Sequence, residues 1–110
     1  MDDIINIEYI RKLYGSGGVI WTDHIQKRLE KRNINIADIE KVLMYGEIIE
    51  KYPEDYPYPS CLILGFNVNN NYIHVVCGIN NIELHLITAY YPNPDKWSED
   101  FKVRINKGEI

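Results

Sequence analysis

The sequence lacks any long apolar run. No stretch approaches the roughly 20 consecutive apolar residues that span a bilayer. The chain starts with Met1 and two acidic residues, Asp2 and Asp3, whereas secretory signal peptides begin with basic residues. We therefore expect a cytoplasmic protein with no membrane partner. With 45% hydrophobic and 25% charged residues among 110, the chain has the composition of a single folded domain.

Cysteines are scarce, and motifs for binding metals or phosphate are absent. Cys61 and Cys77 both lie within apolar runs, and two such residues are too few for a disulfide framework, so we expect buried free thiols. There is no CxxC pair and no HExxH motif, and the glycine cluster at residues 15–18 lacks the GK[ST] ending of a phosphate-binding loop. We expect no metal and no cofactor. A zinc site built from the three histidines stays open as an alternative.

The chain carries opposite charges in two separate stretches. Its formal net charge of −4 argues against a general nucleic-acid coat protein. Residues 24–32 nevertheless hold four basic side chains and one acidic one, a local charge of +3, and residues 47–55 hold four acidic side chains and one basic one, a local charge of −3. The first stretch can hold a phosphate backbone at low salt. The second can contact a basic partner.

Helical signals fill the first part of the chain. Apolar residues recur at helical spacing in three segments: 3–14, 22–33 and 35–45. Thr22 and Asn35 are of the residue types that cap helix N-termini, and Gly46 supplies a C-terminal stop. A brief extended piece at 19–21 lies between the first two helices. The glycine cluster ends the first helix, so residues 1–18 form an N-terminal helix and a glycine-rich linker.

Strand signals fill the second part. Four segments have strand character: 47–52, 60–68, 72–79 and 82–90. The segment 53–59 holds three prolines and is expected to be an irregular loop, and residues 95–105 are a candidate for a short C-terminal helix. These elements predict an α+β fold, in which N-terminal helices pack on one face of a four-stranded, mainly antiparallel sheet. We expect one domain over residues 1–110, with its core in 19–105.

The last two strands set the expected register of the sheet. If residues 80–81 form a two-residue turn, positions whose numbers add up to 161 face each other. The opposite face then carries His74 and His85, diagonal to each other and within reach of a shared ligand. This register puts Thr88 and Tyr90 on the core side, so that Tyr90 reaches His74 only around the sheet edge or through a β-bulge. The expected core face carries Ile73, Val75, Cys77 and Ile79.

A row of basic side chains borders the apolar stripe of the second helix. Ile25 and Leu29 lie one turn apart and are expected to face the core, and His24, Arg28 and Arg32 recur at the same four-residue spacing beside them. Charge runs on helices usually face water. A solvated amphipathic helix with a chance histidine therefore stays open as the alternative to a binding surface.

Histidine, arginine and tyrosine supply the groups that a metal-free ribonuclease needs. Such an enzyme uses a base for the 2′-hydroxyl, an acid for the leaving oxygen and cations for the charge of the phosphorane. His74 and His85 suit the first two tasks, and Arg28 and Arg32 suit the third because a guanidinium grips phosphate oxygens. The alternative is that both histidines are ordinary surface residues. Four tyrosines are candidates to stack on unpaired bases or to donate to phosphate: Tyr58, Tyr72, Tyr90 and Tyr91.

Ordered blocks of the sequence carry a family resemblance. They are Trp21-Thr22-x-His24-x3-Arg28-x3-Arg32-x-Ile34, Gly46-Glu47-Ile48-Ile49-Glu50-x-Tyr52-Pro53-x-Asp55-x-Pro57-x-Pro59-Ser60-x-Leu62, His74-Val75-Val76, and Ile87-Thr88-x-Tyr90-x-Pro92-x4-Trp97-x2-Asp100. From about residue 21 to 104, the chain resembles the bacterial domain-of-unknown-function family numbered 4258. The resemblance implies a fold of the RelE- and barnase-like ribonuclease superfamily. Members of the family look like toxins encoded beside a small zinc-finger or helix-turn-helix antitoxin. The residues that match the family pattern are His24, Arg28, His74, Thr88 and Tyr90, with His85 a looser match.

Together, the residues and the resemblance predict a metal-independent endoribonuclease. It would be the toxin of a toxin–antitoxin pair and would cleave RNA, such as mRNA, by attack of the 2′-hydroxyl, with a cognate antitoxin as protein partner. The expected catalytic residues are His24, Arg28, His74 and Tyr90, and the expected substrate-binding residues are Arg32, Thr88, His85 and Tyr58. A non-catalytic protein- or RNA-binding module that uses the same surface stays open, as does a fold whose activity has decayed. Which histidine is the acid and which is the base also stays open.

Overall fold

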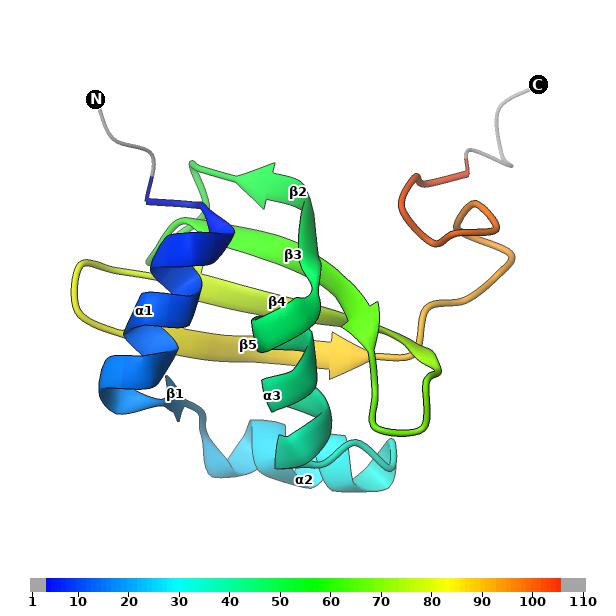
Figure 1. Ribbon diagram of the computed structural model, residues 1–110, viewed down its shortest axis with the longest axis horizontal. Coiled ribbons are helices and arrows are strands. Elements are labelled where there is room, and N and C mark those ends of the chain that lie inside the picture. Colours follow the sequence, from blue (N-terminus) through cyan, green and yellow to red (C-terminus); the bar gives the residue numbers. More distant parts are fainter. Residues whose placement is uncertain (1–3, 106–110) are drawn as a thin grey trace.

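Helices precede strands along the chain, as the α+β prediction requires. The computed structural model describes residues 4–105. Its elements are α1 (Ile7–Gly17), β1 (Val19–Ile20), α2 (Asp23–Lys31), α3 (Ile36–Tyr45), β2 (Glu47–Tyr52), β3 (Ser60–Phe66), β4 (Tyr72–Ile79) and β5 (Leu84–Tyr90). Figure 1 shows α1 and α3 crossing in front of the sheet, whereas α2 lies along its lower margin beside β5. None of these helices is long and apolar enough to cross a membrane.

The sheet has five strands rather than the four expected. Its order is β1-β5-β4-β3-β2, and β1 pairs with β5 in parallel, while the other pairs are antiparallel. The sheet is therefore mixed. Only a brief extended piece was expected at β1, because two residues are too few to show the alternation that identifies a strand.

Local signals at the ends of α2 and α3 are confirmed, whereas the expected glycine-rich linker is wrong, because residues 15–17 belong to α1 and only Gly18, with a φ of 73°, lies beyond its end. The Thr22 hydroxyl accepts a hydrogen bond from the Ile25 amide at 3.2 Å, and Asn35 forms a reciprocal capping box with Asp38. Gly46 ends α3 by donating its N–H to the Val42 carbonyl at 2.8 Å. A Cβ atom at Gly46 would lie 2.5 Å from the Val42 carbonyl oxygen and 2.6 Å from the Leu64 carbonyl oxygen. Glycine is therefore required there.

The main core lies between the helices and one face of the sheet. As expected, the apolar face of β4 contributes Ile73, Val75, Cys77 and Ile79, all with no exposed surface. Cys61 and Cys77 face each other across β3 and β4 as buried free thiols. Burial raises the pKa of the Cys77 thiol, so this sulfur is an apolar packing group. The helices contribute Ile10, Leu13, Leu29, Ile39, Val42 and Leu43.

The expected register of β4 and β5 is wrong. Residues 80–83 form the connection, and the Asn80 side-chain oxygen accepts from the amides of Ile82 and Glu83 at 2.9 and 2.7 Å. A two-residue turn is thus replaced by a longer loop. A β-bulge then shifts the pairing between Val76 and Cys77, so that His74 faces Tyr90. The bulge, one of the two options considered above, brings Tyr90 to the same face as His74.

The two strand histidines lie far apart. His74 faces Tyr90, whereas His85 faces Gly78 on β4. Positions 74 and 78 are separated by about 13 Å along a strand. The predicted diagonal contact between His74 and His85, and with it a ligand shared by both, is wrong.

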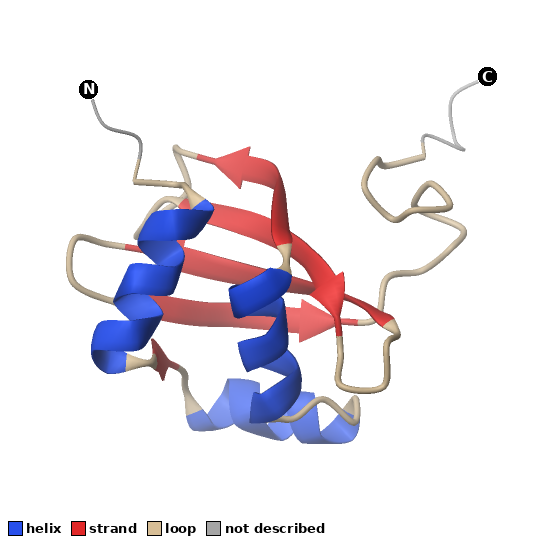
Figure 2. Cartoon of the chain, viewed as in Figure 1, coloured by secondary structure: helices blue, strands red, loops and turns tan. Residues whose placement is uncertain are grey.

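The C-terminal segment, residues 92–105, has no helix. Figure 2 shows it as loop and turn. The Asp100 side chain accepts from the Ser98 hydroxyl at 2.7 Å and from the Lys102 amide at 3.2 Å, and such local bonds compete with helical ones. Trp97 and Arg104 form an isolated antiparallel bridge. The segment folds back over the second face of the sheet, where Trp97 is only 4% exposed.

Candidate functional site

The predicted site residues occur as four separate pairs. Hydrogen bonds and ring contacts among residues 4–105 join the two members of each pair, and none of them joins one pair to another. Within residues 4–105, His24 on α2 and His74 on β4 are therefore not joined by direct contacts. The pairs are His24 with Arg28, Arg32 with Thr88, His74 with Tyr90, and His85 with Tyr58.

Two anchors fix α2 alongside β5. Before the helix, β1 pairs Ile20 with His85. After the helix, Arg32 Nη1 donates to the Thr88 hydroxyl at 3.1 Å and to the Ala89 carbonyl at 2.8 Å. Nine helical residues rise about 13.5 Å, and β5 covers about 13 Å from residue 85 to 89. The helix therefore runs beside β5 in the same direction, as Figure 1 also shows.

We call the region where α2 runs beside β5 the α2–β5 border; His24 and Arg28 lie on its helix, and His85 and Thr88 lie on its strand. His24 and Arg28 are exposed on α2, and Arg28 Nη2 lies 2.9 Å from His24 Nε2. A guanidinium has only donors, so His24 Nε2 accepts this hydrogen bond and carries no proton. A basic ring nitrogen and a cation thus lie together, open to solvent.

Arg32 is not a free phosphate clamp. Its Nη1 is bonded to two acceptors on β5, and its side chain is half-buried. Tyr91 reinforces the same junction, because its hydroxyl donates to the Asn33 carbonyl at 3.0 Å. Arg32 and Thr88 therefore position the helix. Tyr91 was expected to stack on a base or to donate to phosphate, and nothing in its spacing indicated this structural role.

His74 lies on the second face of the sheet, as expected, but it is fully buried. Its Nε2 lies 3.0 Å from the Phe101 carbonyl, and its Nδ1 lies 3.3 Å from the Tyr90 hydroxyl. Because a carbonyl only accepts, Nε2 carries the proton and Nδ1 accepts from Tyr90. The Trp97 ring covers the imidazole edge-on, with 4.5 Å between ring centres. Burial lowers the pKa of His74 below its ordinary 6.5.

A charged network surrounds this histidine and was missed from the sequence. Arg104 makes a two-pronged contact with Glu50, Nε to Oε2 at 2.9 Å and Nη2 to Oε1 at 3.0 Å. Tyr52 also donates to Glu50. Burial raises the pKa of Glu50, but the hydrogen bonds from Arg104 and Tyr52 outweigh it and hold that pKa below its ordinary value. The residues come from distant segments, so no spacing pattern pointed to them.

His85 and Tyr58 lie on the part of the second face that the C-terminal segment leaves open. Their rings stack with 4.7 Å between centres and an angle of 21°. His85 Nε2 is 3.4 Å from a Glu83 carboxylate oxygen. Ile87, two residues after His85 on β5, is 40% exposed. This end of the sheet therefore contributes a half-buried histidine, His85, to the α2–β5 border, with the Tyr58 ring stacked on it.

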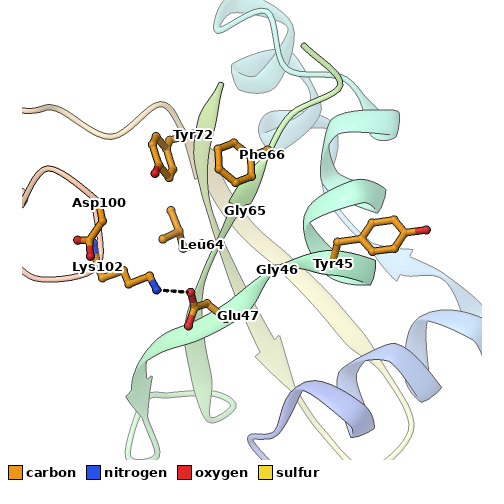
Figure 3. Close-up of a pocket in the computed structure, with 9 residues that line it drawn as sticks. All are labelled: Tyr45, Gly46, Glu47, Leu64, Gly65, Phe66, Tyr72, Asp100 and Lys102. Atoms are coloured by element: carbon orange, nitrogen blue, oxygen red, sulfur yellow. Dashed lines mark hydrogen bonds and ion pairs between the residues drawn. The ribbon is translucent and has the colours of Figure 1, made fainter. Parts of the chain in front are cut away.

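A separate pocket of about 280 Å³ opens near the end of α3. Figure 3 shows Phe66 and Tyr72 side by side, near the loop that carries Asp100 and Lys102. None of the eight predicted catalytic and substrate-binding residues lines it, but Tyr72, one of the four candidate stacking tyrosines, does. Its lining is Tyr45, Gly46, Glu47, Leu64, Gly65, Phe66, Tyr72, Asp100 and Lys102.

The three histidines do not converge. Within residues 4–105, no group of three or more histidine, cysteine, aspartate or glutamate side chains is arranged to hold a metal ion. A zinc site from His24, His74 and His85 is therefore not formed in this part of the chain.

Comparison with known proteins identifies the family but not an activity. No curated protein and no solved structure matches the chain. The family model described as "Domain of unknown function (DUF4258)" matches residues 21–91, which is more than half of the chain. The match runs from the start of α2 through β5 and ends before the C-terminal segment, although the resemblance was expected to extend to about residue 104. The chain belongs to the family described as Domain of unknown function (DUF4258).

Proposed function

We propose that the protein is a metal-independent endoribonuclease of the RelE- and barnase-like superfamily that acts at the α2–β5 border. The observation that carries the proposal is the exposed contact between His24 Nε2 and Arg28 Nη2 at 2.9 Å. It places an unprotonated imidazole nitrogen beside a guanidinium, the two groups that 2′-hydroxyl activation and phosphate binding require. The local charge of +3 over residues 24–32 favours an anionic ligand.

In this mechanism, Arg28 releases His24 and binds the non-bridging oxygens of the scissile phosphate. His24 Nε2 accepts the 2′-hydroxyl proton, and the 2′-oxygen attacks phosphorus. The bond from phosphorus to the 5′-oxygen breaks, and we assign the proton that this oxygen takes up to His85 in its protonated form. The products are a 2′,3′-cyclic phosphate and a 5′-hydroxyl. Arg28 stabilises the charge of the phosphorane.

The remaining predicted residues take supporting roles. Tyr58 extends the surface beside His85 on which a base can stack, and Arg32 and Thr88 fix the helix on which the pair lies. His74 and Tyr90 move from catalysis to packing, because both nitrogens of His74 are bonded and its ring is covered.

The biological setting follows from the family resemblance. The protein would be the toxin of a toxin–antitoxin pair, would cleave mRNA in the cytoplasm, and would be inhibited by a small zinc-finger or helix-turn-helix antitoxin. The burial of His74 favours one alternative, a non-catalytic module of the same fold that binds RNA or protein, since it removes one of the three histidines from the solvent-exposed surface.

Cleavage assays separate these functions. Purified protein is incubated with a single-stranded RNA oligonucleotide in EDTA, and the fragment ends are analysed. We expect cyclic phosphate ends, and we expect His24→Ala and Arg28→Ala each to lower the rate about 100-fold or more while the protein stays folded. Lys27→Ala, an exposed change on the same helix, is the matched control and should retain most of the activity.

Two results would contradict the proposal. RNA binding without cleavage by the wild-type protein supports the binding module instead. Undiminished cleavage by both His24→Ala and Arg28→Ala rules out the α2–β5 border as the active site.

A further inference from the structure

The pocket near the end of α3 is distinct from the α2–β5 border and has its own chemistry. We call it the Phe66 pocket. Figure 3 shows Leu64, Phe66 and Tyr72 on one side of it and the Lys102–Glu47 ion pair on another, whereas the Tyr45 ring points away from Phe66 and Tyr72. The pocket therefore combines an apolar wall with charged groups.

Its apolar wall ends in an exposed aromatic ring. Phe66 and Tyr72 are cross-strand partners at one end of β3 and β4, and their ring centres are 4.7 Å apart. Tyr72 contacts Phe101 in turn at 4.9 Å, so the three rings form a row. Phe66 is the last ring of this row and is 43% exposed. An exposed phenylalanine that borders a concave surface is typical of binding sites.

The charges in the pocket favour a cationic ligand. Glu47 and Asp100 are two carboxylates against the single ammonium of Lys102. The Lys102–Glu47 pair, at 2.8 Å, has side chains that are 45% and 56% exposed, and an ion pair this exposed is easily exchanged. Both hydrogen bonds to the Asp100 side chain fall on Oδ1. Two carboxylates beside an aromatic ring repel phosphate groups and attract a guanidinium.

The positions of the groups fit the length of an arginine side chain. Glu47 faces Leu64 in the register of β2 and β3, and Phe66 is the next residue of β3 whose side chain lies on the same face. Such diagonal neighbours are about 7–8 Å apart. An arginine that lies flat on the Phe66 ring can therefore reach the Glu47 carboxylate.

The protein already contains one such arrangement next to this pocket. The Arg104 guanidinium lies over the Trp97 ring, 4.7 Å from its centre, and forms its two-pronged contact with Glu50. The β-bulge between Ile48 and Glu50 shifts the register, so that Glu47 and Glu50 lie on the same face although they are three residues apart. The Phe66 pocket offers the same combination, a β2 glutamate and an aromatic ring, with the ring exposed.

We propose that the Phe66 pocket binds an arginine side chain of a partner protein. The guanidinium stacks on Phe66 and replaces the Lys102 ammonium at Glu47, forming a two-pronged contact that a lysine cannot make. The proposal does not depend on ribonuclease activity, because it uses none of the residues of the α2–β5 border.

The binding of short arginine-containing peptides tests the proposed arginine site. Acetyl-Gly-Arg-Gly-amide is titrated into the full chain, and the aromatic ring signals of Phe66 and Tyr72 are followed by NMR. We expect shifts confined to the pocket and weak, millimolar binding. Phe66→Ala should lower the affinity about two- to five-fold, and Glu47→Gln should lower it by at least as much. Lys102→Gln should raise it, because a competing cation is removed.

Matched controls distinguish this site from general attraction to an acidic protein. Glu54→Gln neutralises an exposed carboxylate outside the pocket and should leave binding unchanged. A peptide with citrulline in place of arginine should not bind. Equal binding of the citrulline peptide, an unchanged affinity of Phe66→Ala, or displacement of the peptide by adenosine monophosphate at equal concentration would each overturn the proposal.

Discussion

Removal of the Arg32 side chain should destabilise the fold rather than only weaken the affinity for RNA. Arg32→Ala deletes two hydrogen bonds from a charged donor, to Thr88 and to the Ala89 carbonyl. Hydrogen bonds to charged groups contribute about 1.5–3 kcal/mol each when well shielded, and the half-exposure of Arg32 reduces that amount. We expect a loss of about 2 kcal/mol in the free energy of unfolding, or a fall in Tm of about 8 °C.

Companion variants make this expectation specific. Thr88→Val removes one acceptor and leaves the Ala89 carbonyl, so it should cost about 1 kcal/mol. In the double variant with Arg32→Ala, Thr88→Val should lower the free energy of unfolding by less than it does alone, because the two residues share one contact. Lys31→Ala, an exposed neighbour on α2, should change stability by less than about 0.5 kcal/mol. Urea unfolding followed by circular dichroism measures all four proteins.

One outcome would refute the reasoning. If Arg32→Ala unfolds at the wild-type urea concentration while its affinity for RNA drops, then Arg32 acts as the phosphate clamp that the spacing suggested. Its contacts to β5 would then contribute nothing to the stability of the fold.

Other positions give independent expectations. Gly46→Ala should cost about 1–3 kcal/mol, because its Cβ would lie 2.5 Å from a backbone carbonyl, whereas Gly15→Ala, with open space around it, should be neutral or slightly stabilising by thermal melting. Trp97→Ala should cost about 3–5 kcal/mol in urea unfolding, since the ring is buried over His74. In the folded protein, burial lowers the pKa of His74 below its ordinary 6.5. As the pH falls through 6.5, the unfolded chain therefore takes up a proton before the folded chain does. The free energy of unfolding should have its full value above pH 6.5 and decline below it. His74→Gln should flatten that decline in urea titrations on either side of pH 6.5.

Features fixed by neighbouring residues were predictable from the sequence. Thr22, Asn35 and Gly46 act within one helical turn of themselves, and the apolar face of β4 follows from simple alternation. The contact of His24 with Arg28 is likewise a spacing of four residues on one helix.

Features fixed by tertiary contacts were not predictable. The two β-bulges change which residues share a face. Two apolar residues stand side by side at each of them, Ile48-Ile49 and Leu86-Ile87, but a strand buried on both faces shows the same pattern. The contact of Arg104 with Glu50 joins positions 54 residues apart. The segment that carries Arg104 has local bonds in place of helical ones, so its path over His74 is determined by the docking of Trp97 rather than by its own propensity.

Arg32, which fixes α2 to the sheet, also lies at the edge of β5, where a strand of another molecule could otherwise pair. β1 pairs with Leu84 and His85, so within residues 4–105 the later residues of β5 have no neighbouring strand on that side. Unpaired strand edges recruit other chains and start aggregation. The guanidinium of Arg32 occupies the Ala89 carbonyl, which would be an acceptor for an incoming strand. The hydrogen bond to the Ala89 carbonyl, one of the two that hold the helix, therefore also protects this edge from pairing with a strand of another molecule.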